Sequence, residues 1–171
     1  MGVWSVALLL PLALAGALTT VEKIRPGSDN QTTLTVEFIR QNTGPQDTVL
    51  LWGTQTVVYF LAERGAPTRF VHQIPLFNQR YATGEIIGEF LADLEQRAPA
   101  LIIDTRLDSM PLPYSPDGAA RCGQTDRPIP AGMEQVYSFI CANYERVTEI
   151  GPDSWIVYRY NPAIHADQEK R

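Results

Sequence analysis

The residues of this chain that could carry chemistry each follow a short apolar run in the sequence. They are Gly53, Thr54, His72, Asp104 and Arg106. If the apolar runs are parallel strands, their carboxyl ends meet at one edge of a sheet, where ligands bind in such folds. We therefore predict a ligand site at this edge.

Two kinds of chemistry fit these residues, and each has a plain structural alternative. His72 and Asp104 form a general acid/base pair if they lie within hydrogen-bond reach; otherwise His72 is a strand-end histidine bonded to backbone. The turn over residues 52–56 presents free N–H groups to an anion at a helix start. However, the sequence contains neither glycine-rich phosphate-binding motif, so a tight strand-to-helix turn is the alternative. Ser109 and Ser115 lack the G-x-S-x-G elbow, which disfavours a serine hydrolase.

The chain has two cysteines, Cys122 and Cys141. Two cysteines are too few for a zinc site, and no histidine lies at zinc-finger spacing from them. In an oxidising compartment they would form a disulfide with each other, and the alternative is two unrelated buried thiols. The sequence therefore predicts no metal site and no cofactor.

An aromatic-rich stretch covers residues 52–81. Aromatic side chains can stack on sugars or pack against lipid headgroups, but they more often fill a core. The stretch contains Trp52, Tyr59, Phe60, Phe70, Phe77 and Tyr81.

The elements that would position these residues alternate between strands and helices. Apolar runs predict strands over residues 48–52, 68–72, 99–104 and 155–160. Helical spacing predicts helices over 34–41, 57–61 after a cap at Thr54, 86–94 after a cap at Thr83, and 133–144. A long loop rich in Pro and Gly covers residues 107–132. Such alternation predicts a small three-layer α/β domain of Rossmann-like type with a mostly parallel sheet.

The first 21 residues carry no charge, whereas the rest of the chain is polar and globular in composition. The favoured interpretation of residues 1–21 is a transmembrane helix, with a signal-like segment or a buried core helix as alternatives. Residues 22–161 then form one domain and residues 162–171 a polar tail. A net charge of -5 without a basic cluster argues against nucleic acid as a partner.

Three segments together resemble the C-terminal extracytoplasmic domain of bacterial polytopic glycosyltransferases, which are dolichyl-phosphate-mannose-protein mannosyltransferase-like or aminoarabinose-transferase-like. They are DTVLLWGTQTVVYFLAERGAPTRFVHQIPLF, EFLADLEQRAPALIIDT and WIVYRY. The shared motifs are the W-G after the first strand, the R-G-A-P-T-R-F turn and the P-A-L-I-I-D strand. They indicate a fold rather than a catalytic site.

The resemblance implies a non-catalytic accessory domain, or a fragment, of a membrane enzyme that transfers a sugar from a polyprenyl-phosphate donor. Such a domain would lie on the extracytoplasmic side of the membrane, contact lipid and a membrane-embedded catalytic part, and shape acceptor access. No residue of this chain inherits a catalytic role, so enzymatic activity is left open. The alternative function is a self-standing, anchored or exported module that binds a glycan or a lipid head group, with a polyprenyl phosphate as the lipid ligand.

Overall fold

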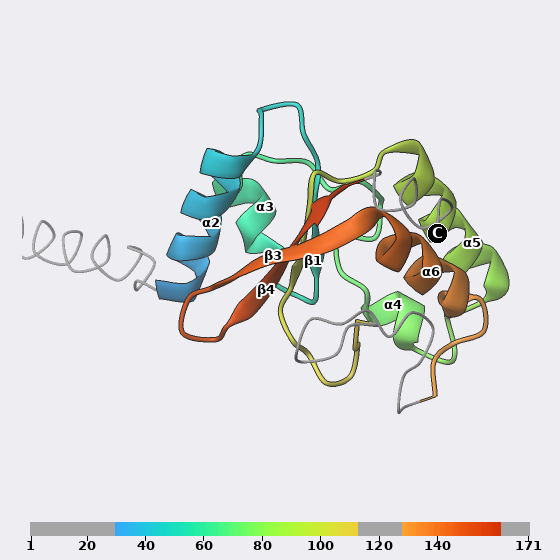
Figure 1. Cartoon of the computed structure of the whole chain (residues 1–171). Coiled ribbons are helices and arrows are strands. Elements are labelled where there is room, and N and C mark those ends of the chain that lie inside the picture. Colours follow the sequence, from blue (N-terminus) through green and yellow to red (C-terminus); the bar gives the residue numbers. More distant parts are fainter. Residues whose placement is uncertain (1–29, 113–127, 162–171) are drawn as a thin grey trace, which may run out of the picture.

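A computed structural model of the chain describes residues 30–112 and 128–161. At its centre is one four-stranded sheet (Figure 1). Its strands, in spatial order, are β1 (Val49–Trp52), β2 (Leu101–Asp104), β4 (Trp155–Tyr160) and β3 (Tyr144–Ile150). Only β1 and β2 pair in parallel, whereas β2 with β4 and β4 with β3 are antiparallel. The prediction of a Rossmann-like domain with a mostly parallel sheet is therefore wrong.

The physical reason is a hairpin near the end of the described chain. The predicted helix over 133–144 ends at Asn143, and β3 begins at the next residue. Gly151 then turns the chain with a φ of +68°, and the Ser154 N–H donates to the Gly151 carbonyl at 3.1 Å. A tight turn of this kind can only join antiparallel strands. It returns β4 into the gap between β2 and β3.

The segment 68–72, predicted as a strand, is irregular. The Thr68 hydroxyl accepts a hydrogen bond from the Phe70 N–H at 2.9 Å, so the side chain takes the donor that a sheet ladder would use. The preceding Gly65 instead forms an isolated parallel bridge with Thr48. As a consequence, His72 does not lie at the end of a strand.

Helices lie on both faces of the sheet, and each face has its own core (Figure 1). Helices α2 (Asn30–Asn42) and α3 (Val57–Ala62) pack on one face. On the other face lie α4 (Ile74–Phe77), α5 (Gly84–Gln96) and α6 (Met133–Asn143). Alternate residues of β1, β2 and β4 point to opposite cores, as the pleat requires.

Two helix starts test the predicted caps. The Thr83 side chain accepts a hydrogen bond from the Ile86 N–H at the start of α5, as predicted. The N-cap position of α3 is Thr56 rather than the predicted Thr54, and its side chain makes no capping hydrogen bond.

In the part of the chain that the structure describes, no helix has both the length and the apolar character needed to cross a bilayer. The predicted transmembrane helix over residues 1–21 lies outside the described residues, as does the tail over 162–171. The described helices thus give no support to the predictions of a membrane protein and of a membrane-anchored location, and both predictions are withdrawn.

Candidate functional site

The carboxyl ends of β1 and β2 lie side by side and are tightly packed. Gly53 has a φ of +152°, and a Cβ atom at this position would come within 2.0 Å of the Thr105 hydroxyl oxygen. That hydroxyl donates to the Trp52 carbonyl at 3.0 Å. The Gly53 N–H donates to the side-chain oxygen of the fully buried Gln73 at 2.8 Å. The space and the N–H group at this edge are therefore already used by the protein.

Asp104 is the buried ionisable group of this edge, with 8% of its surface exposed. Its Oδ1 accepts a hydrogen bond from the Arg106 N–H at 2.8 Å, which is an Asx-turn. Burial raises the Asp104 pKa to about 6, against smaller lowering effects of the Arg106 N–H and charge. Arg106 is itself exposed and has a left-handed backbone with a φ of +59°.

The segment that follows β2 is fastened to the edge by two further side chains. The Trp52 indole N–H donates to the Met110 carbonyl at 2.8 Å, and the Tyr137 hydroxyl of α6 donates to the Pro111 carbonyl at 2.5 Å. Met110 and Leu112 are buried. Burial, and secondly the Asp104 charge, raise the Tyr137 pKa, so the phenol stays protonated and remains a donor.

The structure does not bring the remaining predicted residues together into a reactive group. In the described chain, His72 and Asp104 share no hydrogen bond, and the buried His72 Nδ1 has no hydrogen-bond partner. Thr54 is exposed, and its carbonyl accepts from the Thr56 N–H at 2.9 Å within a tight turn. At this edge, Gly53 is hydrogen-bonded to Gln73 and Asp104 to the Arg106 N–H. The predicted acid/base pair of His72 and Asp104 is not formed among the described residues.

The two cysteines are described only in part. Cys141, in α6, is disulfide-bonded. Cys122, its predicted partner, lies outside the described residues. Among the residues that the structure does describe, no three His, Cys, Asp or Glu side chains gather as a metal site would require.

Most aromatic side chains of residues 52–81 pack in or against the two cores. Trp52 packs edge-on against Phe77 and Phe90, with ring centroids 6.1 and 6.2 Å apart. Phe60 and Tyr81, by contrast, are 82% and 60% exposed.

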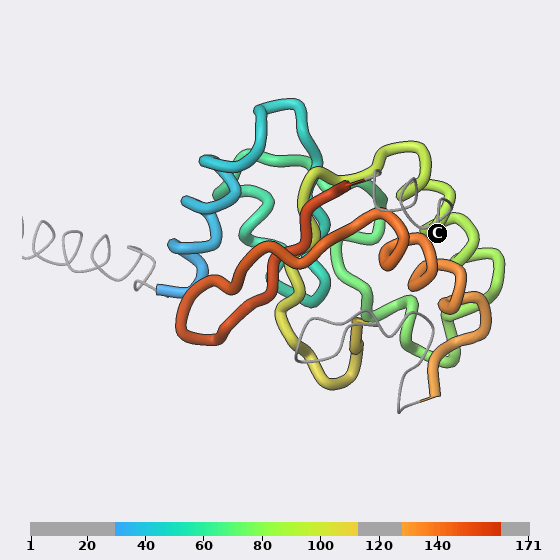
Figure 2. Tube along the Cα trace, in the orientation of Figure 1, coloured from blue at the N-terminus to red at the C-terminus, as the bar shows by residue number. Residues whose placement is uncertain are grey.

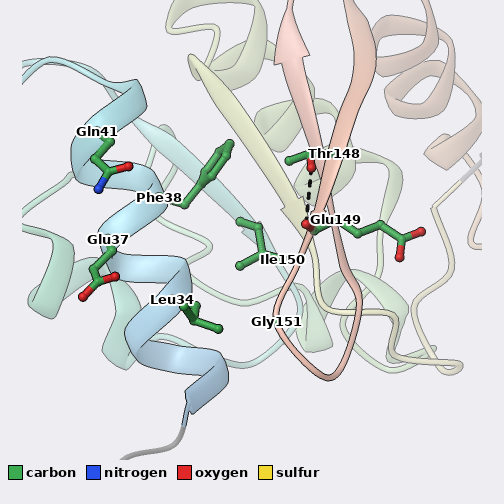
Figure 3. A pocket seen from close by; sticks show the side chains of 8 residues that line it. All are labelled: Leu34, Glu37, Phe38, Gln41, Thr148, Glu149, Ile150 and Gly151. Carbon is green, nitrogen blue, oxygen red and sulfur yellow. Dashed lines mark hydrogen bonds between the residues drawn. The ribbon is translucent and has the colours of Figure 1, made fainter.

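A groove that the sequence did not predict runs between α2 and β3 (Figure 3). Its volume is about 270 Å³. The side chains of Leu34 and Phe38 on α2 face Ile150 on β3 across it, whereas Glu37 and Glu149 point away from its floor. The eight lining residues are Leu34, Glu37, Phe38, Gln41, Thr148, Glu149, Ile150 and Gly151.

The two walls of the groove come from opposite ends of the described chain, which lie side by side in Figure 2. Buried Gln31 of α2 fastens them together, because its Nε2 donates to the Ile150 carbonyl at 2.9 Å and its Oε1 accepts from the Asp153 N–H at 3.0 Å. One wall has a signal in the sequence, which is the i,i+4 spacing of Leu34 and Phe38. β3 has no such signal, because its bulge around Val147 interrupts the alternation of a regular strand.

Comparison with known proteins gives no match to a family model, to a curated protein or to a solved structure. The resemblance to extracytoplasmic domains of glycosyltransferases therefore receives no support, and the association with that enzyme family is not retained.

Proposed function

We propose that this chain is a non-catalytic binding domain whose ligand is a glycan, held in the groove between α2 and β3. The observation that carries the proposal is the composition of the groove. Leu34, Phe38 and Ile150 form an apolar floor, and the rim carries hydrogen-bonding side chains without any Lys, Arg or His among the lining residues. Ligand sites commonly combine an apolar lining with a few polar groups.

A sugar ring is amphipathic in the same way. Its C–H face can pack on the half-buried Phe38 ring and on Ile150, while its hydroxyls bond to polar groups at the rim. Glu37 and Gln41 are exposed, and within the described chain neither side chain has a hydrogen bond or ion pair to the protein. Figure 3 shows both side chains directed away from Ile150, so they can accept hydrogen bonds only from ligand hydroxyls that reach over the rim of the groove, and a carboxylate is the stronger acceptor.

The charge of the groove distinguishes between the two ligand classes that the sequence suggests, a glycan and a polyprenyl phosphate. A polyprenyl phosphate brings a negative charge that is normally met by Arg, Lys or free N–H groups. The groove offers instead the carboxylate of Glu37, on a chain of net charge -5. A neutral glycan fits this surface better than a phosphate.

The groove is small, so we expect weak binding. Its volume of about 270 Å³ suits one sugar ring rather than a long glycan. At about −0.3 kcal/mol for each non-hydrogen atom, a hexose ring of about 12 such atoms would bind with about −4 kcal/mol, which is a dissociation constant of about 1 mM.

The test is calorimetric titration of the full chain with neutral methyl glycosides, together with two phenylalanine variants. Phe38→Ala removes the aromatic ring from the floor of the groove and should abolish the heat of binding. Phe60→Ala removes an 82% exposed phenylalanine outside the groove and should leave binding unchanged. Equal affinity of the Phe38→Ala variant and the unmodified chain would refute the proposal, and Tm values of both variants show that each is folded.

A further inference from the structure

We propose that the segment 105–112 is a pH-responsive flap, docked on the carboxyl edge of β1 and β2 while Asp104 is protonated and loosened when Asp104 ionises. The flap shares no residue with the glycan groove. Its release depends on how the segment is fastened and on what surrounds the Asp104 carboxyl.

The flap is held by hydrogen bonds near both of its ends and by the buried side chains of Met110 and Leu112. Its start is fixed by the Asx-turn from Asp104 to the Arg106 N–H and by Thr105, whose N–H and hydroxyl both donate to the Trp52 carbonyl. Its end is fixed by the hydrogen bonds of Trp52 to Met110 and of Tyr137 to Pro111. Between these points, the Met110 N–H donates to the Leu107 carbonyl at 2.9 Å. These contacts join the segment to the edge of the sheet and do not join the strands to one another, so the segment can be released while the strands stay paired.

The Asp104 carboxyl lies where ionisation is poorly compensated. Its partners across the sheet are Trp52 on β1 and Ile156 on β4, and both are apolar. The same face carries Ile102, two residues before it on β2. A buried carboxylate without a cation in contact favours any motion that returns it to water.

Within residues 30–112 and 128–161, two charged or titratable groups act on Asp104 from the elements packed against it. Arg106, on the flap itself, is exposed and favours the ionised carboxyl only weakly. Tyr137, on α6, interacts with Asp104 electrostatically and is a protonated donor to the flap. Neither group cancels the cost of burial, which is the largest influence on the Asp104 pKa.

The direction of the pH effect follows from the raised pKa. The docked state holds its proton to about pH 6, whereas the carboxyl in water loses it near the ordinary value of 3.8. Docking is therefore most stable below pH 3.8, weakens as the pH rises to about 6, and stays constant above that. Because this shift spans about two pH units, the population with the flap released should rise by up to on the order of 100-fold.

Hydrogen exchange measured by mass spectrometry on the full chain tests the proposal. Exchange of peptides over residues 105–112, corrected for intrinsic rates, is compared with that of peptides over β4 between pH 4 and pH 7. The Asp104→Asn variant keeps an acceptor for the Arg106 N–H but cannot ionise. Asp153→Asn, which removes an exposed carboxylate from the β3–β4 turn, is the matched control.

We expect the flap peptides of the unmodified chain and of Asp153→Asn to lose protection at the higher pH while β4 does not, and Asp104→Asn to show no such loss. An ordinary histidine also titrates in this range, and the Asp104→Asn variant separates the two groups. Equal pH dependence in all three proteins would overturn the proposal. So would a loss of protection shared by β4, because that would mean global destabilisation. If Asp104→Asn does not fold, the ratio of flap to β4 exchange in the unmodified chain still decides, since a ratio independent of pH excludes a flap.

Discussion

At the scale of single residues, the two glycines Gly53 and Gly88 should respond oppositely to alanine. Gly53→Ala introduces a Cβ 2.0 Å from the Thr105 hydroxyl at a φ of +152°, so it forces both backbone strain and loss of the hydrogen bond to Trp52. We expect a loss of about 2–4 kcal/mol in the free energy of unfolding. Gly88 lies inside α5 with open space around it, and Gly88→Ala should stabilise by about 0.5–1 kcal/mol. Urea unfolding of both variants measures this, and a destabilised Gly88→Ala would contradict it.

Asp104 should also make the free energy of unfolding depend on pH. Because burial raises its pKa from 3.8 to about 6, its ionisation weakens the fold as the pH rises through that interval, and the fold regains this stability on acidification. Asp104→Asn should therefore be more stable than the unmodified chain at pH 7, by at most about 3 kcal/mol. The difference should shrink towards pH 4. A difference that grows on acidification would show that the carboxylate is stabilised in the fold.

Sequence reasoning located these edge residues but not their roles. Asp104 and Gly53 were predicted at strand ends, and they are there. The role of Gln73 was not predicted, because one side-chain amide that accepts a hydrogen bond from one backbone N–H produces no recognisable pattern in the sequence. The predicted pairing of His72 with Asp104 depended on a strand over residues 68–72, and the Thr68 side chain removes that strand.

At the scale of elements, both edges of the sheet need protection, and the β1 edge is sealed by its own crossover segment. Its outward N–H groups donate to the Gly65 carbonyl, the Tyr59 hydroxyl and the Gln73 amide oxygen. Tyr59→Phe leaves the buried Leu51 N–H unpaired and should cost about 1–3 kcal/mol. Tyr81→Phe, at a 60% exposed tyrosine, should cost almost nothing. Comparable losses in thermal unfolding would show that the Tyr59 hydroxyl is not needed at this edge.

The attachment of α2 to the β3–β4 turn should depend on Gln31. Gln31→Leu keeps a similar volume but leaves the Ile150 carbonyl and the Asp153 N–H without their partner. We expect a loss of about 2–4 kcal/mol in unfolding free energy, and weaker glycan binding, because the two walls of the groove are no longer joined. Gln41→Ala, on the exposed face of the same helix, should weaken binding without this loss of stability. If Gln31→Leu kept full stability, the attachment would have to come from apolar packing alone.

The elements that the sequence predicted correctly are those with a strong local signal. The apolar runs of β1 and β2 and the capped, amphipathic α5 belong to this group. β3 was missed because Glu145, Arg146 and Glu149 make it polar and its bulge breaks the period of two. Once β3 is missed, β4 has no antiparallel partner in sequence, and alternation of strands and helices then indicates a parallel sheet.

At the scale of the whole molecule, the two proposed features lie on different parts of one sheet. The groove lies on the face covered by α2, whereas Asp104 belongs to the face covered by α5 and α6. Ligand binding and flap release should therefore be nearly independent, since no residue takes part in both. We expect the affinity for a neutral glycoside to be the same in Asp104→Asn and in the unmodified chain. A change beyond a few-fold would show that the two faces are coupled.

The measurement that tests the central claim most directly is a two-dimensional ¹H–¹⁵N NMR titration of the full chain with a neutral methyl hexoside, repeated with a hexose phosphate. Our account predicts saturable shifts at residues 34–41 and 148–151, with a dissociation constant of about 1 mM for the neutral sugar and weaker binding of the phosphate. Shifts confined to other residues, or none at about ten times that concentration, would contradict it. Preference for the phosphate would contradict the assignment of a neutral glycan.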